Sequence, residues 1–332
     1  MSVNIVGQDN GAGLSVDTGL LRTIVEGDGF RVRWSRRPMP TPWQRRLESR
    51  GLLGWTQPWY DINIFLERFH PAWFPYALRN ILIPNPEWFV DEQLQNFAGI
   101  DEVFCKSEDA VKTFSALGKN ARWIGFTGRD LWEGTLAAAR PMRALHVAGR
   151  SEHKGTRYVL EAWRRHPEWP ELTVVQRPLD AATTLDTVPA RNIHFVAGRL
   201  SEQEIQNLRR EHPLWILPSE VEGYGQTLVE GLSVGAIVVT TDAPPMNEIV
   251  QPDRGVLVRA RYVDAVHLGS RYAVEPQALD EAVCDVLGWT LERRLATGTA
   301  ARKWFLENDL RFRRDFSTAL ESLNQGAQRQ GR

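Results

Sequence analysis

The chain has 332 residues, of which 42% are hydrophobic and 24% charged, and its formal net charge is -1. These values are ordinary for a globular protein and exclude a disordered chain, while the small net charge excludes a global attraction to nucleic acid or to an anionic membrane. Two cysteines do not make a disulfide framework, and apolar runs long enough to span a bilayer do not occur in the sequence. Because the length exceeds the usual size of a single core, we expect two domains. The small number of cysteines fits a reducing compartment, so we expect a cytoplasmic protein.

The first part of the chain alternates short apolar runs with helical patterns. A proline-punctuated segment, residues 36–60, interrupts the alternation, and we expect one short helix within it. The patterns predict strands over 3–7, 30–35, 61–67, 80–85, 102–107 and 121–126, and helices over 14–27 and 108–117.

The alternation restarts after a connecting stretch at 131–142. Strands that alternate with helices favour parallel sheets covered on both faces. We therefore predict an α/β fold with two doubly wound, Rossmann-like domains facing each other across a cleft: residues 1–138 and residues 139–304, with a C-terminal helix at about 305–330 that packs back onto the first domain. The patterns of the second part predict strands over 143–149, 172–176, 192–198, 214–219 and 236–239, helices over 155–166, 201–211 and from about Thr227, and a long amphipathic helix or pair of helices over 301–323.

A Gly-Tyr-Gly turn separates Glu222 from Glu230, shortly after a predicted buried strand. Ligands of doubly wound sheets bind beyond the carboxyl ends of the strands, and a helix start favours a phosphate there. Glu230 has the chemistry to accept two hydroxyl hydrogens, as a ribose presents them, and Glu222 those of a second polyol. The alternative is structural: Thr227 would be an N-cap, Glu230 the acid of a capping box, and Glu222 an exposed loop residue.

A second loop of this kind spans residues 147–155. Arg150 and Lys154 flank the start of a predicted helix, and Gly155 closes the loop. A guanidinium and an ammonium at such a place suit a diphosphate. A solvated basic loop is the alternative reading.

The N-terminal loop, residues 7–15, superficially suggests a dinucleotide fingerprint with Gly11 and Gly13. Val16 stands where the fingerprint requires glycine or alanine, and no acidic residue follows the second predicted strand. We therefore predict no nicotinamide cofactor, and a glycine loop that lets a ligand approach closely stays open.

Residues 31–51 hold seven arginines against one glutamate, with Trp34 and Trp43 interleaved. Basic segments with tryptophan suit the headgroup layer of a membrane or an anionic acceptor. A solvated loop in which arginine and tryptophan side chains stack is the commoner outcome, and peripheral membrane contact through residues 31–60 stays open as the alternative.

Together these motifs resemble the retaining glycosyltransferases of family 4, which have the GT-B fold. The resemblance is carried by the Glu-Gly-aromatic-Gly and later Glu of residues 218–250, by the Gly-Arg…Lys-Gly of residues 147–155, and by residues 125–130, which look like the segment leading into the interdomain linker. It implies a metal-independent hexosyltransferase that uses a UDP or GDP sugar, a front-face mechanism and no bound cofactor. The implied acceptor is a carbohydrate, a lipid-linked sugar or a natural product, and nucleic acid is not a partner.

The resemblance also implies roles for individual residues. Arg150 and Lys154 would hold the diphosphate, Glu230 the ribose, and Glu222 would lie against the donor sugar. His70 is the candidate for the family's N-terminal active-site histidine. The remaining implied donor contacts are the turn of Gly223, Tyr224, Gly225, Gln226 and Thr227, the loop of Gly11, Ala12 and Gly13, which would close over the phosphates, and residues 195–200 with Arg199.

Other readings keep the fold and change the activity. A sugar-nucleotide epimerase or a phosphorolytic enzyme is one alternative, and a non-catalytic sugar-nucleotide-binding subunit is another.

Overall fold

The structure is a computed structural model, and it describes residues 1–7, 13–35, 58–149, 151–176, 190–196 and 200–330. The chain divides into two compact units: unit 1 is Met1–Phe126 with Leu310–Arg332, and unit 2 is Thr127–Asp309. The sequence-based division falls later, after residue 138. The difference has a physical reason, since the connecting stretch is hydrogen-bonded to unit 2: Ala137 N–H donates to Val234 O and Ala138 N–H to Gly235 O, at 2.8 and 3.1 Å.

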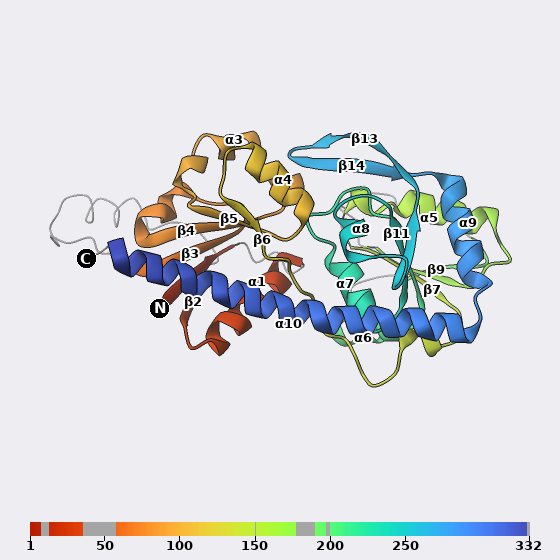
Figure 1. Cartoon of the computed structure of the whole chain (residues 1–332). Helices are drawn as coiled ribbons and strands as arrows, with labels where there is room; N and C mark the ends of the chain where they lie inside the picture. Colours follow the sequence, from red (N-terminus) through yellow and green to blue (C-terminus); the bar gives the residue numbers. More distant parts are fainter. Residues whose placement is uncertain (8–12, 36–57, 150, 177–189, 197–199, 331–332) are drawn as a thin grey trace. The chain divides into compact units, whose positions relative to one another are not determined.

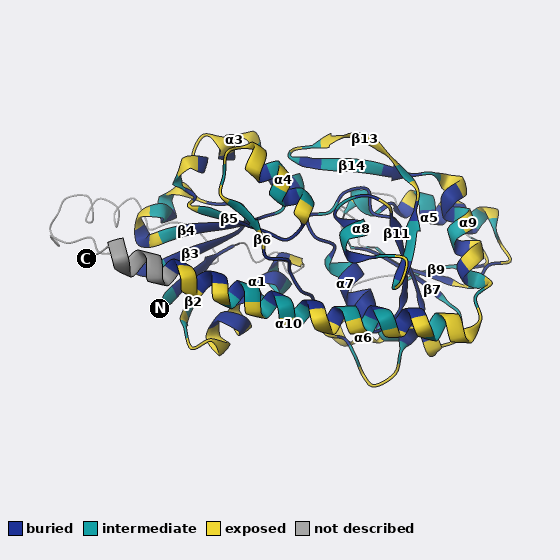
Figure 2. Cartoon of the chain, in the orientation of Figure 1, coloured by how far each residue is buried: buried dark blue, intermediate teal, exposed yellow. Residues whose placement is uncertain are grey.

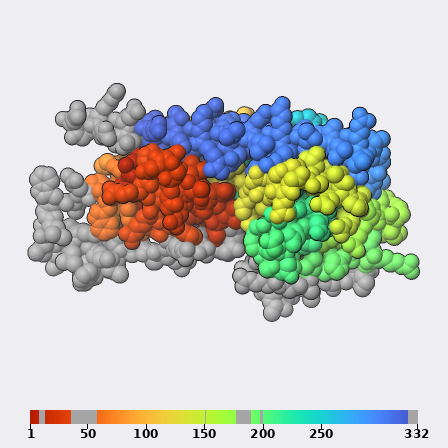
Figure 3. Space-filling view, turned by 90° about the horizontal axis from the view of Figure 1, so that it is seen from below, coloured from red at the N-terminus to blue at the C-terminus, as the bar shows by residue number. Residues whose placement is uncertain are grey.

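Unit 1 contains a six-stranded parallel sheet with the strand order β2-β1-β3-β4-β5-β6 (Figure 1). Helix α1 follows β1 and buries one side, including Leu21, while its other face is exposed and in view in Figure 3, drawn in red. The elements of unit 1 are β1 Ser2–Val6, α1 Gly13–Gly27, β2 Arg31–Ser35, β3 Tyr60–Glu67, η1 Pro71–Tyr76, β4 Ala77–Pro84, η2 Pro86–Trp88, α3 Asp91–Leu94, η3 Phe97–Gly99, β5 Glu102–Cys105, α4 Glu108–Ala116 and β6 Ala121–Trp123.

Unit 2 contains a second six-stranded parallel sheet, with the order β12-β11-β10-β7-β8-β9, and a separate antiparallel hairpin, β13-β14. Its elements are η4 Ala137–Ala139, β7 Ala144–Gly149, η5 Glu152–Lys154, α5 Thr156–Arg165, β8 Leu172–Gln176, β9 Ile193–Phe195, α6 Glu202–Glu211, β10 Leu214–Leu217, α7 Gln226–Ser233, β11 Ile237–Thr241, α8 Met246–Ile249, β12 Gly255–Val258, β13 Ala260–Val266, β14 Gly269–Val274 and α9 Pro276–Leu287.

The core of unit 2 lies around its central strands. Every residue of β10 (LWIL) and of β11 (IVVTT) is buried, as the dark blue of β11 shows in Figure 2. Continuous apolar runs of this kind are typical of strands that are covered on both faces. The strands of the predicted doubly wound fold are therefore confirmed, and with them the α/β class.

Helix α10, Leu291–Gln330, is the longest element and belongs to both units. Its part in unit 1 packs through aromatic rings: Phe312 lies 4.9 Å from Phe126 and Phe316 lies 6.4 Å from Phe104, between ring centroids. The helix begins ten residues before the predicted range of 301–323. Among the described helices, all are too short or too polar to cross a bilayer.

Further differences from the predicted elements are local; among them are the following strand ends. The strand predicted over 121–126 ends at Trp123, because Gly125 has a φ of +68° and breaks the extended backbone. The strand predicted from residue 61 begins at Tyr60, and the one predicted from residue 80 begins already at Ala77. Hairpin β13-β14 and helix α9 have no counterpart among the predicted elements. The short helix expected within 36–60 falls almost wholly on residues outside the described ranges.

Candidate active site

Two loops of unit 2 leave its sheet side by side. Strands β7 and β10 are parallel neighbours, with Ala144 paired to Leu214 and Leu145 to Trp215, so their carboxyl ends meet at one edge. Lys154 ends the loop after β7, Glu222 lies in the loop after β10, and the two side chains form an ion pair. Glu222 also accepts a hydrogen bond from Ser219 Oγ at 2.7 Å. The structure thus brings together two of the residues predicted from the sequence.

Gly155 makes the close approach of these loops possible. Its φ is +69°, and a Cβ atom built on it would lie 2.1 Å from the carbonyl oxygen of Pro218. A larger residue would clash with backbone, which moves less readily than a side chain, and would also be strained at this φ. Gly155 therefore holds Lys154 against the loop after β10.

Helix α7 begins at Gln226, one residue before the predicted start. Its N-cap is Gly225, with a φ of +106°, and no side-chain cap is found there among the described residues. Thr227 consequently lies inside the first turn and does not cap the helix. The capping-box reading of Glu230 is wrong, because the Glu230 carboxylate has other partners.

Glu230 is buried, with 2% of its surface exposed, and is held by two arginines. Arg129 Nε donates to Oε1 at 2.8 Å, and Arg209 Nη2 lies 3.0 Å from Oε2. Arg129 also pairs with Glu202 at the start of α6. Burial lowers the pKa of the Arg209 guanidinium, an effect that Glu230 opposes. Since each carboxylate oxygen has a second acceptor site, Glu230 can still accept hydrogens from a ligand.

Arg129 and Arg209 are not among the residues predicted from the sequence. Arg129 stands in the segment 125–130, whose pattern indicates only a connection between domains. Arg209 is in the last turn of α6, where a basic residue is common because it favours the helix dipole, so nothing in the pattern marks it as buried.

Gln226 presents a buried amide next to Glu230. Its Oε1 and Nε2 atoms are buried and have no hydrogen-bond partner within the described part of the chain. Buried amides are normally satisfied, so an unsatisfied one at a helix start is a candidate for ligand contact. Gly128 lies close to it: a Cβ on Gly128 would be 3.4 Å from Gln226 Nε2.

The remaining residues predicted from the sequence lie in unit 2, in unit 1 or outside the described ranges. Gly223 and Tyr224 form the bend before α7, and both are buried; Tyr224 Oη accepts a hydrogen bond from Asn308 Nδ2 at 3.4 Å. His70 is exposed and is the N-cap of η1 in unit 1, and Gly13 begins α1 in the same unit. Arg150, Arg199, Gly11 and Ala12 lie outside the described residues, as do residues 36–57 of the basic segment.

His146 lies beneath the two loops, in strand β7. It is fully buried; Nδ1 is 2.7 Å from the carbonyl oxygen of Ile216, and Nε2 is 2.9 Å from Thr156 Oγ1. A carbonyl only accepts, so Nδ1 carries the hydrogen and Nε2 accepts from the hydroxyl. Burial lowers the pKa of His146 to about 4, and the charge of Lys154 acts in the same direction. The imidazole is therefore neutral at neutral pH.

This burial makes unfolding sensitive to acid. The unfolded chain has the ordinary histidine pKa of about 6.5, so it binds a proton before the folded chain does, and stability is lost as the pH falls from about 6.5 toward 4. We expect the free energy of unfolding to drop by ~2 to 3 kcal/mol more in the wild type than in His146→Gln between pH 7 and pH 4.5. Urea titrations of both proteins at these pH values measure this; parallel curves would contradict the prediction.

Known proteins resemble the chain in sequence and in fold. Residues 135–284 match the family model described as Glycosyl transferases group 1. Solved structures similar to the chain include HepE from Anabaena in complex with UDP and glucose, with a TM-score of 0.67 at 14% identity, covering 97% of this chain and 100% of that one. Sucrose-phosphate synthase from Thermosynechococcus elongatus has a TM-score of 0.72 at 12% identity, covering 98% and 99%.

A further similar structure, described as trehalose-6-phosphate from E. coli bound with UDP-2-fluoro glucose, has a TM-score of 0.68 at 9% identity and covers 98% of this chain and 99% of that one. No curated protein matches the sequence. The matched family segment contains both loops and helix α7, and the chain has the α/β fold of the GT-B glycosyltransferases.

Proposed function

We propose that the protein is a glycosyltransferase that moves a sugar from a nucleoside diphosphate sugar to an acceptor hydroxyl. The observation that carries the proposal is the meeting of Lys154, Glu222 and the start of α7 at one edge of the sheet in unit 2. A cation, a carboxylate and a helix start are the groups that a sugar diphosphate needs. The match of residues 135–284 to the group 1 family supports the proposal.

In this proposal Glu230 binds the ribose. Its two oxygens are oriented by Arg129 and Arg209, and each keeps one acceptor site for a ribose hydroxyl. A carboxylate whose direction is already set by two guanidinium groups loses little orientational freedom when it binds the hydroxyls.

Lys154 stabilises the departing diphosphate. The bond from the anomeric carbon to the β-phosphate oxygen breaks, and the acceptor oxygen forms the new bond to that carbon. The leaving diphosphate gains negative charge as this happens, which is where a positioned ammonium has its largest effect. In the structure Lys154 pairs with Glu222. When the donor binds, its diphosphate pairs with Lys154 instead, and Glu222 lies against the donor sugar.

The finer assignments are part of the same proposal. Transfer is retaining and follows the front-face course of family 4, with the acceptor proton passing to the donor phosphate and no metal ion required. The base is uracil or guanine, Arg150 acts beside Lys154, and His70 lies near the donor sugar. The acceptor is a carbohydrate, a lipid-linked sugar or a natural product. The proposed location is the cytoplasm, with peripheral contact to the inner face of the membrane through residues 31–60.

The test is a thermal-shift screen of UDP, GDP, ADP and the matching monophosphates. A ligand that binds only the folded state at a hundredfold excess over its Kd adds about 2.7 kcal/mol, so we expect one diphosphate to raise the Tm by a few degrees. The matching monophosphate should raise it less, because it lacks the group that Lys154 contacts. Equal melting curves with and without every diphosphate would refute the proposal. Donor hydrolysis that persists in excess EDTA is the result expected for metal-independent transfer.

A further inference from the structure

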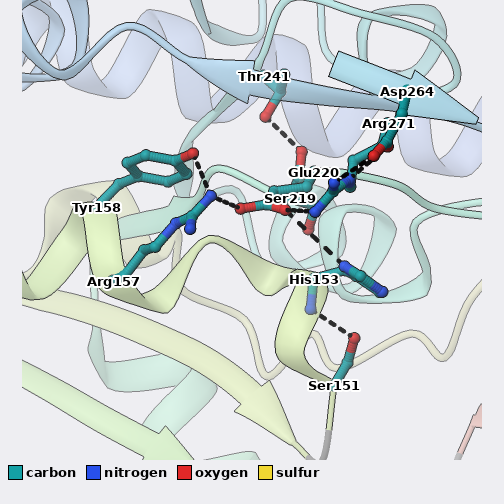
Figure 4. A network of polar contacts seen from close by, with 9 residues as sticks. All are labelled: Ser151, His153, Arg157, Tyr158, Ser219, Glu220, Thr241, Asp264 and Arg271. Atoms are coloured by element: carbon teal, nitrogen blue, oxygen red, sulfur yellow. Dashed lines mark hydrogen bonds and ion pairs between the residues drawn. The ribbon is translucent and has the colours of Figure 1, made fainter. Parts of the chain in front are cut away.

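Glu220 of unit 2 is a buried carboxylate that the proposed reaction does not use. Glu220 lies between Ser219 and Val221 in the loop after β10 and is only 4% exposed. Figure 4 shows it at the centre of a network that joins three parts of the chain: the loop after β7, the start of α5, and hairpin β13-β14. A buried charge is costly unless it is paired, so this arrangement calls for an explanation.

The backbone of Glu220 connects the loop of Lys154 to the hairpin. Its N–H donates to the carbonyl oxygen of His153 at 2.7 Å, and its own carbonyl accepts from Tyr272 N–H at 2.8 Å. His153 directly precedes Lys154 in the sequence, and Tyr272 is in β14. The hairpin is therefore hydrogen-bonded to Glu220, and Glu220 is hydrogen-bonded to the residue that precedes Lys154.

The side chain of Glu220 reinforces the same connection. Arg157 Nη2 in α5 donates to Oε1 at 2.9 Å, while Oε2 lies 3.6 Å from Arg271 Nη1 in β14 and 3.9 Å from His153 Nδ1. Arg271 is itself fixed by Asp264 of β13, which accepts from its Nε at 2.7 Å. Asp264 and Arg271 are a directly paired register position of the hairpin. The orientation of the carboxylate thus depends on hairpin residues.

Residues on both sides of Glu220 in the chain contact the candidate site. Glu222, two residues later, pairs with Lys154, and Ser219, one residue earlier, donates to Glu222. Thr241 Oγ1 in β11 holds the carbonyl oxygen of Ser219 at 2.6 Å. Any shift of the Glu220 backbone would therefore displace Lys154 and Glu222 together.

We propose that Glu220 is a positioning residue for Lys154, and that hairpin β13-β14 is the strap that keeps Lys154 in register with the departing diphosphate. The proposal rests on the proposed glycosyl transfer. Small misplacements of a reacting group can lower a rate by ~100-fold. Since Lys154 acts most strongly when the leaving group is fully charged, misplacing it should reduce kcat and change KM little.

The test uses the full chain with UDP-glucose, or GDP-mannose if GDP gives the larger thermal shift. We expect Glu220→Gln to lower kcat of donor hydrolysis about tenfold, with KM within about threefold of wild type. Asp264→Asn, on the exposed side of the hairpin, should lower kcat in the same way but less, and it tests the strap should Glu220→Gln not fold. The matched control is Glu307→Gln in α10, which removes a carboxylate that is 65% exposed and lies 3.9 Å from its partner Lys303, away from the hairpin.

A double variant distinguishes an effect of Glu220 through Lys154 from a general loss of rigidity in unit 2. If Glu220 acts through Lys154, then Glu220→Gln in the Lys154→Ala background should change kcat less than about twofold, because the effects of coupled residues do not add. A full tenfold drop in that background, or a Glu220→Gln protein whose kcat equals that of the Glu307→Gln control, would overturn this inference but not the proposed function. A wild type that neither binds UDP or GDP nor hydrolyses the donor would overturn the proposed function, and the inference with it.

Discussion

Replacing Lys154 with alanine should lower the rate of sugar transfer about 100-fold or more while the protein stays folded. Lys154 ends the loop after β7 and pairs with Glu222 of the loop after β10, and 20% of its side chain is exposed. Its removal leaves Glu222 with the hydrogen bond from Ser219, which limits the loss of stability. Steady-state kinetics of UDP-glucose or GDP-mannose hydrolysis measure the effect, with urea unfolding as a check on the fold.

Two companion variants sharpen this experiment. Lys303→Ala removes a lysine that is 74% exposed and paired only weakly with Glu307, at 3.9 Å, so its kcat should equal that of the wild type. Lys154→Arg keeps the charge but not the compact ammonium, and should recover part of the lost rate. A Lys154→Ala enzyme with kcat within threefold of the control would remove Lys154 from the mechanism.

Replacing Glu230 with glutamine should destabilise the protein and weaken nucleotide binding at the same time. The change leaves Arg209, which is 8% exposed, without its paired carboxylate. Breaking a buried ion pair by removing one partner is worth about 3 to 5 kcal/mol. Urea unfolding gives the first effect, and calorimetric titration with UDP or GDP gives the second.

The control for Glu230 is Glu202→Gln. Glu202 is the other carboxylate on Arg129, with 62% of its side chain exposed, so its loss should leave both stability and nucleotide affinity nearly unchanged. The ribose assignment has a separate test that needs no variant. The wild type should bind the 2′-deoxy form of the preferred diphosphate about tenfold more weakly, because one hydroxyl contact is lost. Equal affinity for the two nucleotides would show that Glu230 does not read the ribose.

Much of the fold follows from local pattern. Strands such as β10 and β11 are continuous apolar runs because both faces are covered, and a run of that kind is visible in the residues themselves. The two glycine-bearing loops could likewise be placed at strand ends, since Gly155 and Gly225 adopt a φ that disfavours other residues. Hairpin β13-β14 could not be predicted in this way. Its outer strand is mostly exposed, so it lacks the apolar alternation that marks a strand with one buried face.

The residue pattern alone therefore determined the parallel α/β class and the candidates Lys154, Glu222 and Glu230. Only the tertiary structure decided what these residues do with one another. Glu230 is an ion-pair acceptor for Arg129 and Arg209, although those residues are 101 and 21 positions away in the chain. Glu220 is tied to Arg271, 51 positions later. Such partnerships depend on which loops the sheet brings to the same edge, and on which charges lose their water there. Neither the meeting of the loops nor the burial of the charges can be read from the residues adjacent in the sequence.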